Sequence, residues 1–409
     1  MTDTITDNEP AGAPIAKPTS RGADVLFLGT HGQHNIGDEL LLTTFLDQLG
    51  TDHHYRVNSY DPEGTGESLR SRFDAETFHT TDDRGALLGH LRRCDVVVFG
   101  GGSIVKELGA TTGRNRHSTL LMLLALVTVV RWIFRKPMLM SNVGVGPIRS
   151  RTGRLLAGLI LRQVTLISVR DRASHELAAR LGCDDDKLRL VPDAVWANDR
   201  HTFEAGAARP LVSTVRVGLN LNRDIAVPER WDGFVEELRL AIESIASTRD
   251  VELVGIPMQT GFKQNDDRQM LEAFFGTVPS IPSTIVEATD HLDIARAVSG
   301  CDVVMAERLH CLVIASILGR PAVALSYDPK VDELVEQLGL ADRCVDVNAP
   351  FDPNALAAMV DAAVTDRAES ERLVDVAEGL RAEATPSFAQ VRAWIDRHGA
   401  SRSWHELSV

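Results

Sequence analysis

Runs of apolar residues alternate with helical patterns along most of the chain. The first run, ADVLFLGT at 23–30, is continuous, and the pattern that follows at 39–50 has a helical period and stops at Gly50. Continuous apolar runs of this length are typical of strands buried on both faces of a parallel sheet. Strands and helices that alternate at this pace predict a doubly wound α/β architecture.

The alternation falls into two blocks. Further strands of the first block are expected at 54–62, 95–102, 136–147 and 188–196. The stretch NDRHTFEAGAARPLVSTV breaks the rhythm, and a strand at 215–222 with an amphipathic helix at 234–247 then restarts it. The expected segments are a disordered tail at 1–21, an N-terminal α/β domain at 22–197, a linker at 198–215, a C-terminal α/β domain at 216–375 and C-terminal helices at 376–409.

One short motif occurs in each block. CDVVVFGGGS at 94–103 ends in glycines, whereas CDVVMAERLHC at 301–311 ends in an arginine and a histidine. Ligands of open α/β sheets bind outside the carboxyl ends of the strands, where the strand order reverses. The two copies therefore predict two Rossmann-like domains whose strand ends face one cleft. Glycines are expected on one wall of the cleft, and arginine and histidine on the other.

Composition narrows the class of protein. The chain has 409 residues, of which 44% are hydrophobic and 24% charged, the balance of a soluble globular protein. A net charge of -14 argues against nucleic-acid binding, which needs a basic surface. The five cysteines form no CxxC pair and predict free thiols in a reducing cytoplasm. The polar N-terminus does not have the pattern of a signal peptide.

The most apolar stretch is LLMLLALVTVV at 120–130. Its 11 residues fall short of the roughly 20 that a membrane-spanning helix needs. The run therefore predicts a buried helix. An alternative is peripheral contact with the inner face of a membrane. That contact would use Trp132 and Phe134 with the flanking Arg131, Arg135 and Lys136.

The loop after the first strand, GTHGQHNIGDE at 29–39, is the first candidate site. Asn35, Gly37 and Asp38 lie where a helix begins. Glycine allows close approach to the backbone, and a helix N-terminus offers N–H groups, which suits a phosphate or a sugar. Nucleotide-binding fingerprints are not matched. The alternative is simple capping of the helix by its acidic residues. His31 and His34 have no third ligand, so no metal site is expected.

Glycines and an arginine follow three further strands. Gly101, Gly102 and Ser103 end one strand, and a second glycine-rich end contains Gly144 and Gly146. These strand ends predict sites that need bare backbone, with tight turns as the alternative.

Arg170 ends the apolar strand of SVRD at 168–171. A buried arginine is unfavourable unless it is paired. Arg170 is therefore expected either to bond Asp171 or a helix end, or to hold an anion in the cleft.

The sequence ERLH at 307–310 gives the sharpest signal. Arg308 can hold a phosphate or a carboxylate, and His310 can transfer protons near neutral pH. Glu307 can orient either one. The alternative is a capping ion pair beside a packed histidine.

These motifs together resemble the polysaccharide pyruvyl transferase family, from about Gly22 to about Leu338. The resemblance implies a GT-B-like pair of domains, phosphoenolpyruvate as donor, a sugar acceptor, a pyruvate ketal as product and no further cofactor. The matching segments are NIGDE (35–39), FGGGS (99–103), GVGP (144–147), SVRD (168–171), PDAVW (192–196) and ERLHCLVIASILGRPAVALSYDPK (307–330).

The same resemblance implies roles for single residues. Arg170 and Arg308 would hold the donor's phosphate and carboxylate, and His310 would lie against the donor. That His310 protonates the donor is a hypothesis from its chemistry. The family's usual Asp-Pro is here Pro192-Asp193, so the place of Asp193 is open. The polar stretch at 263–264 is a loose candidate for the acceptor side.

Family members act on cell-envelope polymers, exopolysaccharides or lipid-linked sugars, and the apolar helix favours a lipid-linked acceptor. Two rival functions stay open. A GT-B glycosyltransferase would bind a nucleotide sugar, with Glu333 at the ribose. A binding or assembly protein would have kept the fold and lost the chemistry.

Overall fold

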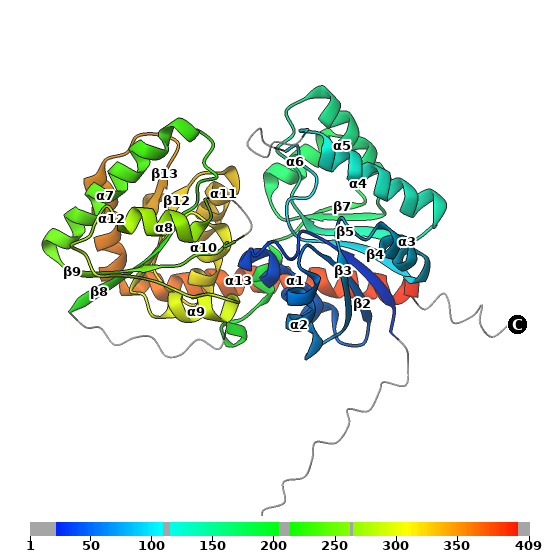
Figure 1. Cartoon of the computed structure of the whole chain (residues 1–409), viewed down its shortest axis with the longest axis horizontal. Coiled ribbons are helices and arrows are strands. Elements are labelled where there is room, and N and C mark those ends of the chain that lie inside the picture. The colour runs from blue at the N-terminus through cyan, green and yellow to red at the C-terminus, as the bar shows by residue number, and fades with distance from the viewer. Residues whose placement is uncertain (1–21, 109–114, 204–212, 262–264, 400–409) are drawn as a thin grey trace, which may run out of the picture.

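The computed structural model describes residues 22–108, 115–203, 213–261 and 265–399. Two α/β domains lie side by side, and one long helix runs across both of them (Figure 1). The predicted tail at 1–21, the centre of the predicted linker and the polar pair Lys263 and Gln264 lie outside the described residues. The described chain enters the second domain at Thr214, within the predicted linker.

The first domain is built on a seven-stranded parallel sheet in the order β3-β2-β1-β4-β5-β6-β7. Its central strands are apolar and buried, apart from the partly exposed Asp24 at the start of β1, as the continuous apolar runs predicted. The strands are β1 (Asp24–Leu28), β2 (His54–Ser59), β3 (Asp74–His79), β4 (Val96–Gly100), β5 (Met138–Val143), β6 (Leu166–Val169) and β7 (Leu188–Leu190).

Helices cover both faces of this sheet (Figure 1). They are α1 (Ile36–Leu49), α2 (Pro62–Arg70), α3 (Arg84–Arg93), α4 (Ser118–Thr128) with its π-helical extension η2 (Val129–Ile133), α5 (Arg151–Gln163) and α6 (Arg172–Arg180). Two short 3₁₀ segments follow, η3 (Ala194–Ala197) and η4 (Arg200–Phe203).

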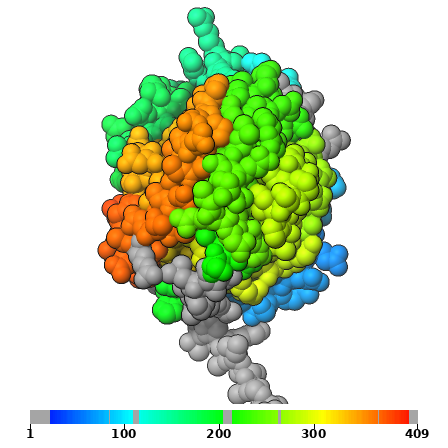
Figure 2. Space-filling view, turned by 90° about the vertical axis from the view of Figure 1, so that its left-hand side faces the viewer, coloured from blue at the N-terminus to red at the C-terminus, as the bar shows by residue number. Residues whose placement is uncertain are grey.

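The second domain repeats the plan with six parallel strands in the order β10-β9-β8-β11-β12-β13. The strands are β8 (Thr214–Asn220), β9 (Asp250–Gly255), β10 (Ser283–Ile285), β11 (Val303–Ala306), β12 (Ala322–Ser326) and β13 (Cys344–Asp346). The helical segments are η5 (Pro228–Arg230), α7 (Trp231–Thr248), α8 (Asp267–Phe275), α9 (His291–Ser299), α10 (Leu309–Ile317), α11 (Pro329–Leu338), η6 (Ala341–Arg343) and α12 (Pro353–Thr365). Figure 2 shows α7 and α12 side by side on its outer face.

The aspartate of the repeated CDVV motif makes the same kind of hydrogen bond in both domains. Asp95 accepts a hydrogen bond from the N–H of Asp24 on β1, at 2.9 Å. Asp302 accepts one from the N–H of Arg216 on β8, at 2.8 Å. Each aspartate thus links the start of its own strand, β4 or β11, to the start of the neighbouring central strand. The carboxyl ends of β4 and β11 face the space between the domains, which confirms the predicted two-domain α/β fold.

The last helix, α13 (Arg367–Gly399), packs against α1, η3 and α10 and so touches both domains. The sequence predicted more than one helix in the segment 376–409, but within the described residues a single helix is continuous through Pro386. The predicted boundary after residue 375 falls inside it. Phe388 packs edge-on against Phe45 of α1, so burial on the first domain holds the helix together across the proline.

One predicted strand is shorter than expected. The pattern at 188–196 suggested a single strand, but β7 ends at Leu190. The side chain of Asp193 accepts a hydrogen bond from the N–H of Val195 at 3.0 Å and starts η3 instead. This local side-chain bond competes with the sheet ladder and turns the chain toward the cleft.

Candidate functional site

A cavity of about 390 Å³ opens between the two sheets at the carboxyl ends of their strands. One wall comes from the loops after β1, β4 and β6, and the other from the loops after β8, β9, β11 and β12. Its lining consists of Thr30, Gln33, Asn35, Asp38, Gly102, Ser103, Lys106, Arg170, Asp224, Met258, Gln259, Arg308, Leu309, His310, Tyr327, Asp328, Lys330 and Val331.

Short backbone contacts hold the two walls together. The Ile36 N–H donates to the Met258 carbonyl at 2.8 Å, and Asn35 forms a β-bridge with Gln259. On the opposite side, the Glu333 carboxylate of α11 accepts from the N–H of Arg172 at the start of α6, at 2.7 Å. Glu333 therefore joins the domains, which leaves it a poor candidate for a nucleotide ribose.

Arg170 directly follows β6, and its largely buried side chain lies against Asp193. One guanidinium N–H donates to the Asp193 carboxylate at 2.7 Å, while the Nε–H is buried without a partner. Burial alone would raise the pKa of Asp193, but Arg170 and His310 outweigh it and hold that pKa below its ordinary value. The pairing partner of Arg170 is thus Asp193, and not Asp171 as one alternative had it.

Arg308 follows β11 and is anchored by the buried Asp267 of α8. Its Nη2 donates to Asp267 at 2.6 Å and its Nε at 3.2 Å. Burial alone would lower the pKa of Arg308, but Asp267 outweighs it and the pKa stays above its ordinary value. The remaining Nη1 lies 3.8 Å from Asp224 at the cavity wall. The anchor leaves part of the guanidinium fork directed at the cavity.

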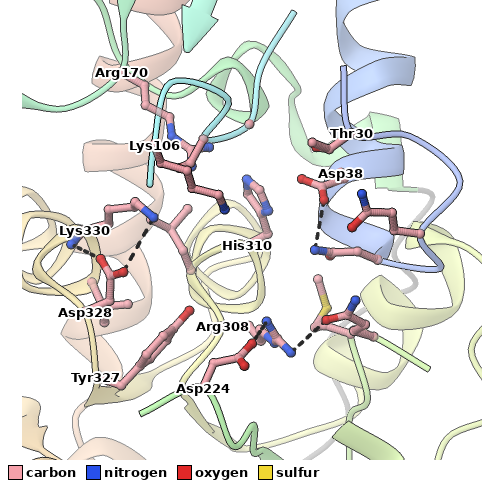
Figure 3. Close-up of a pocket in the computed structure, with 18 residues that line it drawn as sticks. Thr30, Asp38, Lys106, Arg170, Asp224, Arg308, His310, Tyr327, Asp328 and Lys330 are labelled. Atoms are coloured by element: carbon pink, nitrogen blue, oxygen red, sulfur yellow. Dashed lines mark hydrogen bonds and ion pairs between the residues drawn. The ribbon is translucent and has the colours of Figure 1, made fainter. Parts of the chain in front are cut away.

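His310 reaches across from the second domain to the first. A Cβ on Gly37 would lie 2.2 Å from its Nδ1, so the ring packs directly on the backbone of α1. Its Nε2 lies 3.7 Å from the Asp193 carboxylate, within reach of ionic attraction but too far for a hydrogen bond. Figure 3 shows His310 at the centre of the cavity, with Arg170 and Lys106 on one side and Arg308 on the other.

The N-terminus of α1 differs from the prediction in one respect. Its first N–H groups are already bonded, Ile36 to Met258 and Gly37 to the Asn35 side chain at 3.0 Å, so they are not free for a ligand. The carboxylate of Asp38 lines the cavity instead. Burial raises the pKa of Asp38, although His310 and the surrounding cations oppose the shift.

The glycine-rich strand ends contribute less than expected. Gly102 and Ser103 line the cavity, but Gly101, Gly144 and Gly146 do not. Gly101 and Gly146 have positive φ angles of 63° and 111°, which turn the chain. A Cβ on Gly144 would lie 2.6 Å from the Ser103 hydroxyl oxygen. These three glycines therefore let two loops pack closely and bring Ser103 to the cavity.

Glu307 was predicted to bind substrate, but its side chain is fully buried behind the cavity wall. It accepts a hydrogen bond from the Asn222 N–H at 2.5 Å, and its other oxygen has no partner. Burial raises its pKa well above the ordinary value. Neighbouring residues at a strand end point to opposite sides, so Glu307 and Arg308 cannot both face the cavity.

We expect Glu307→Gln to remove a pH-dependent loss of stability. Because the folded-state pKa of Glu307 is raised, this residue costs wild type no stability below the ordinary carboxyl pKa, where it is protonated in both the folded and the unfolded state. The free energy of unfolding of wild type then falls as pH rises through the raised value, by about 1.4 kcal/mol for each unit of difference between the two pKa values. The glutamine keeps an acceptor for the Asn222 N–H and does not ionise. Denaturant unfolding from acid to neutral pH should show the two proteins diverging, and parallel curves would contradict the assignment.

Several lining residues were not predicted from sequence. Lys106 follows β4, Asp224 follows β8, and Tyr327, Asp328 and Lys330 follow β12. The last three lie in YDPK, a segment noted only for its resemblance, where a proline after a strand signals a helix start. In the described part of the chain, no three His, Cys, Asp or Glu side chains are grouped as metal ligands.

A sequence model of one family, described as Polysaccharide pyruvyl transferase, matches residues 35–329. The chain belongs to this family. The match runs from the last residue before α1, through both arginine-bearing strand ends, to the start of α11. It includes every cavity-lining residue before Lys330 except Thr30 and Gln33.

Among curated proteins, the chain is similar to the amylovoran biosynthesis protein AmsJ of Erwinia amylovora, with 23% identity over 286 residues. The alignment covers 65% of this chain and 65% of AmsJ, so it spans just under two thirds of that relative.

Solved structures share the fold at low identity. Anabaena HepE, in a complex with UDP and glucose, has a TM-score of 0.60 at 14% identity, covering 91% of this chain and 99% of its own. A putative UDP-N-acetylglucosamine 2-epimerase from Listeria monocytogenes has a TM-score of 0.60 at 11% identity, covering 92% and 97%. These likenesses show a GT-B-like fold and nothing about substrate.

Proposed function

We propose that the protein transfers the pyruvyl group of phosphoenolpyruvate to two hydroxyls of a sugar in a polysaccharide or lipid-linked glycan. The product is a pyruvate ketal, and phosphate is released. The observation that carries the proposal is the cavity between the domains of a polysaccharide pyruvyl transferase family member. Four cationic side chains and a histidine line it, namely Lys106, Arg170, Arg308, Lys330 and His310.

The charges suit a small trianionic donor. Arg170 and Arg308 keep their positive charge despite burial, because Asp193 and Asp267 lie behind them. Each guanidinium still has N–H groups for a planar carboxylate or a phosphate. The N-terminus of α10 carries no side-chain cap and adds positive potential at the same wall.

The transfer needs one proton donor and acceptors for two hydroxyl protons. Protonation of the donor's methylene carbon places positive charge on the carbon that bears the phosphate ester. A sugar hydroxyl attacks that carbon and loses its proton. The carbon–oxygen bond to phosphate then breaks, and a second hydroxyl attacks, loses its proton and closes the ketal. His310 is assigned as the acid. Asp38, on the facing wall, is assigned as the base for one hydroxyl proton, and the released phosphate takes up the other.

Phosphoenolpyruvate should raise the melting temperature of the purified protein. Donor at 100 times its Kd stabilises a protein by about 2.7 kcal/mol, which gives a readable shift. We also expect phosphate release only when a glycan acceptor is added. Pyruvate instead of phosphoenolpyruvate is the matched control, because it lacks the phosphate and should shift the melting temperature little.

The alternative donor is a nucleotide sugar, and the only observation that favours it is the fold shared with solved structures such as HepE. A melting shift with UDP-sugars and none with phosphoenolpyruvate would replace pyruvyl transfer by glycosyl transfer. No shift with either donor, with or without acceptor glycan, would favour a non-catalytic binding protein.

A further inference from the structure

The outer face of α4 and η2 is largely apolar, with Thr128 and Arg131 as its exposed polar residues. Leu121, Met122, Ala125, Trp132 and Ile133 recur at helical spacing and are exposed, with Trp132 and Ile133 each 69% exposed. The opposite face of the same helix is buried on the sheet through Leu120, Leu123, Val127 and Val130. The helix expected to be buried is therefore only half covered.

Helix α5 extends this apolar surface. Its Leu155 is 62% exposed and its Leu159 39%. The two helices lie side by side: the His117 ring nitrogen and the Ser150 hydroxyl are 2.9 Å apart at one end, and Gln163 donates to Thr128 at 3.2 Å toward the other. We call the surface formed by Leu121, Met122, Ala125, Trp132, Ile133, Leu155 and Leu159 the α4–α5 face.

The segment that contains this face carries positive charges only. Residues 108–170 contain ten basic residues and no aspartate or glutamate, in a chain whose net charge is -14. The acidic residue just before this stretch, Glu107, is buried and bonded to the N–H of Arg149 at 3.1 Å. Among the described arginines of this stretch, seven are exposed, namely Arg116, Arg131, Arg135, Arg149, Arg151, Arg154 and Arg162.

Two residues of the peripheral-contact hypothesis do not take part. Phe134 packs against the core of the first domain. Lys136 donates its ammonium protons to the carbonyls of Cys94 and Arg92 at the edge of the sheet. The apolar anchors are instead Trp132 and its neighbours on the outer face, with arginines beside them.

We propose that the α4–α5 face docks on an anionic lipid bilayer, with α4 lying in the plane of the interface. Tryptophan and apolar side chains enter such interfaces, and arginines beside them bind anionic headgroups. In the described residues, no helix is long and apolar enough to cross a membrane, which fits a helix that lies on the surface. Two copies of this chain would bring seven arginines against seven, so a self-association through this face is disfavoured.

The position of α4 and α5 relates the proposed docking to the cavity. Helices α4 and α5 both start at the edge of the sheet where the strands end, which is the edge that borders the cavity. A protein bound by these helices would hold its cavity close to the membrane surface. This consequence, that the acceptor is a lipid-linked glycan, rests on the proposed function, whereas the lipid docking itself does not.

Vesicle sedimentation tests the proposal with the full chain at low salt. We expect the protein to pellet with phosphatidylcholine vesicles that contain phosphatidylglycerol, and little with phosphatidylcholine alone. The double variant Trp132→Gln/Ile133→Gln should lose most of this binding. Arg151→Gln/Arg154→Gln should weaken it by about fivefold for each arginine. Leu240→Gln, an exposed leucine of α7 that is 41% exposed, is the matched control and should bind as wild type does.

Other outcomes would overturn the proposal. These are failure to pellet with anionic vesicles, or equal pelleting by wild type and the Trp132/Ile133 variant. A concentration-dependent dimer that the same variant abolishes would assign the face to a second copy of the chain. All variants should melt as wild type does and keep the shift with phosphoenolpyruvate. Vesicle binding without any donor shift would remove the proposed function and leave lipid docking intact.

Discussion

His310→Asn is expected to slow pyruvyl transfer by about 10²–10⁴-fold, the usual contribution of a positioned general acid. Donor binding should change far less, because Arg170 and Arg308 are unaffected. The ring lies against the backbone of Gly37, and asparagine is smaller, so the packing can accept it. Single-turnover phosphate release at saturating donor measures the chemical step, and the phosphoenolpyruvate melting shift measures binding.

A histidine outside the cavity provides the matched control. His291→Asn changes the first residue of α9, away from the cavity lining, and should leave the rate unchanged. If His310→Asn abolished the melting shift as well, His310 would be a donor-binding residue and the acid would have to be sought elsewhere. An unchanged rate would leave the ring with a packing role only.

The central strands could be predicted from sequence because their signal is local. β1, β4 and β11 are short apolar runs, buried on both faces. The edge strand β3 alternates between exposed and partly buried positions, with Phe78 as its one buried residue, and was missed. It is held by full pairing with β2 and by an ion pair from Arg56 to Glu76. Such a strand depends on a partner distant in sequence, which a local pattern does not show.

The site residues divide in the same way. Arg170, Arg308 and His310 stood out because charged groups directly follow apolar strands, and all three line the cavity. Their partners could not be predicted. Asp267 precedes Arg308 by 41 residues and belongs to no motif that the sequence shows. Asp193 is brought to Arg170 only by the turn into η3. Lys106 and Asp224 lie in loops, where position depends on tertiary packing alone. The catalytic and binding roles stay predictions.

Arg308→Ala is expected to abolish the phosphoenolpyruvate melting shift and to destabilise the protein. Removing one partner of a buried ion pair usually lowers the free energy of unfolding by about 3–5 kcal/mol. The loss here should be at the lower end, because Asp267 keeps hydrogen bonds from the N–H groups of Met258 at 3.1 Å and Gln259 at 3.2 Å. Denaturant unfolding measures the stability, and the melting shift measures donor binding.

A second substitution separates these two effects. In Arg308→Ala/Asp267→Asn, the amide oxygen can take the place of the carboxylate oxygen Oδ2, which accepts both backbone N–H groups. The amide nitrogen then faces the space that the guanidinium vacated, and no buried charge is left unpaired. Stability should largely return, whereas the donor shift should not. If the shift returned with stability, Arg308 would only support the fold, and the donor's anionic groups would have to be bound by Arg170 and the lysines.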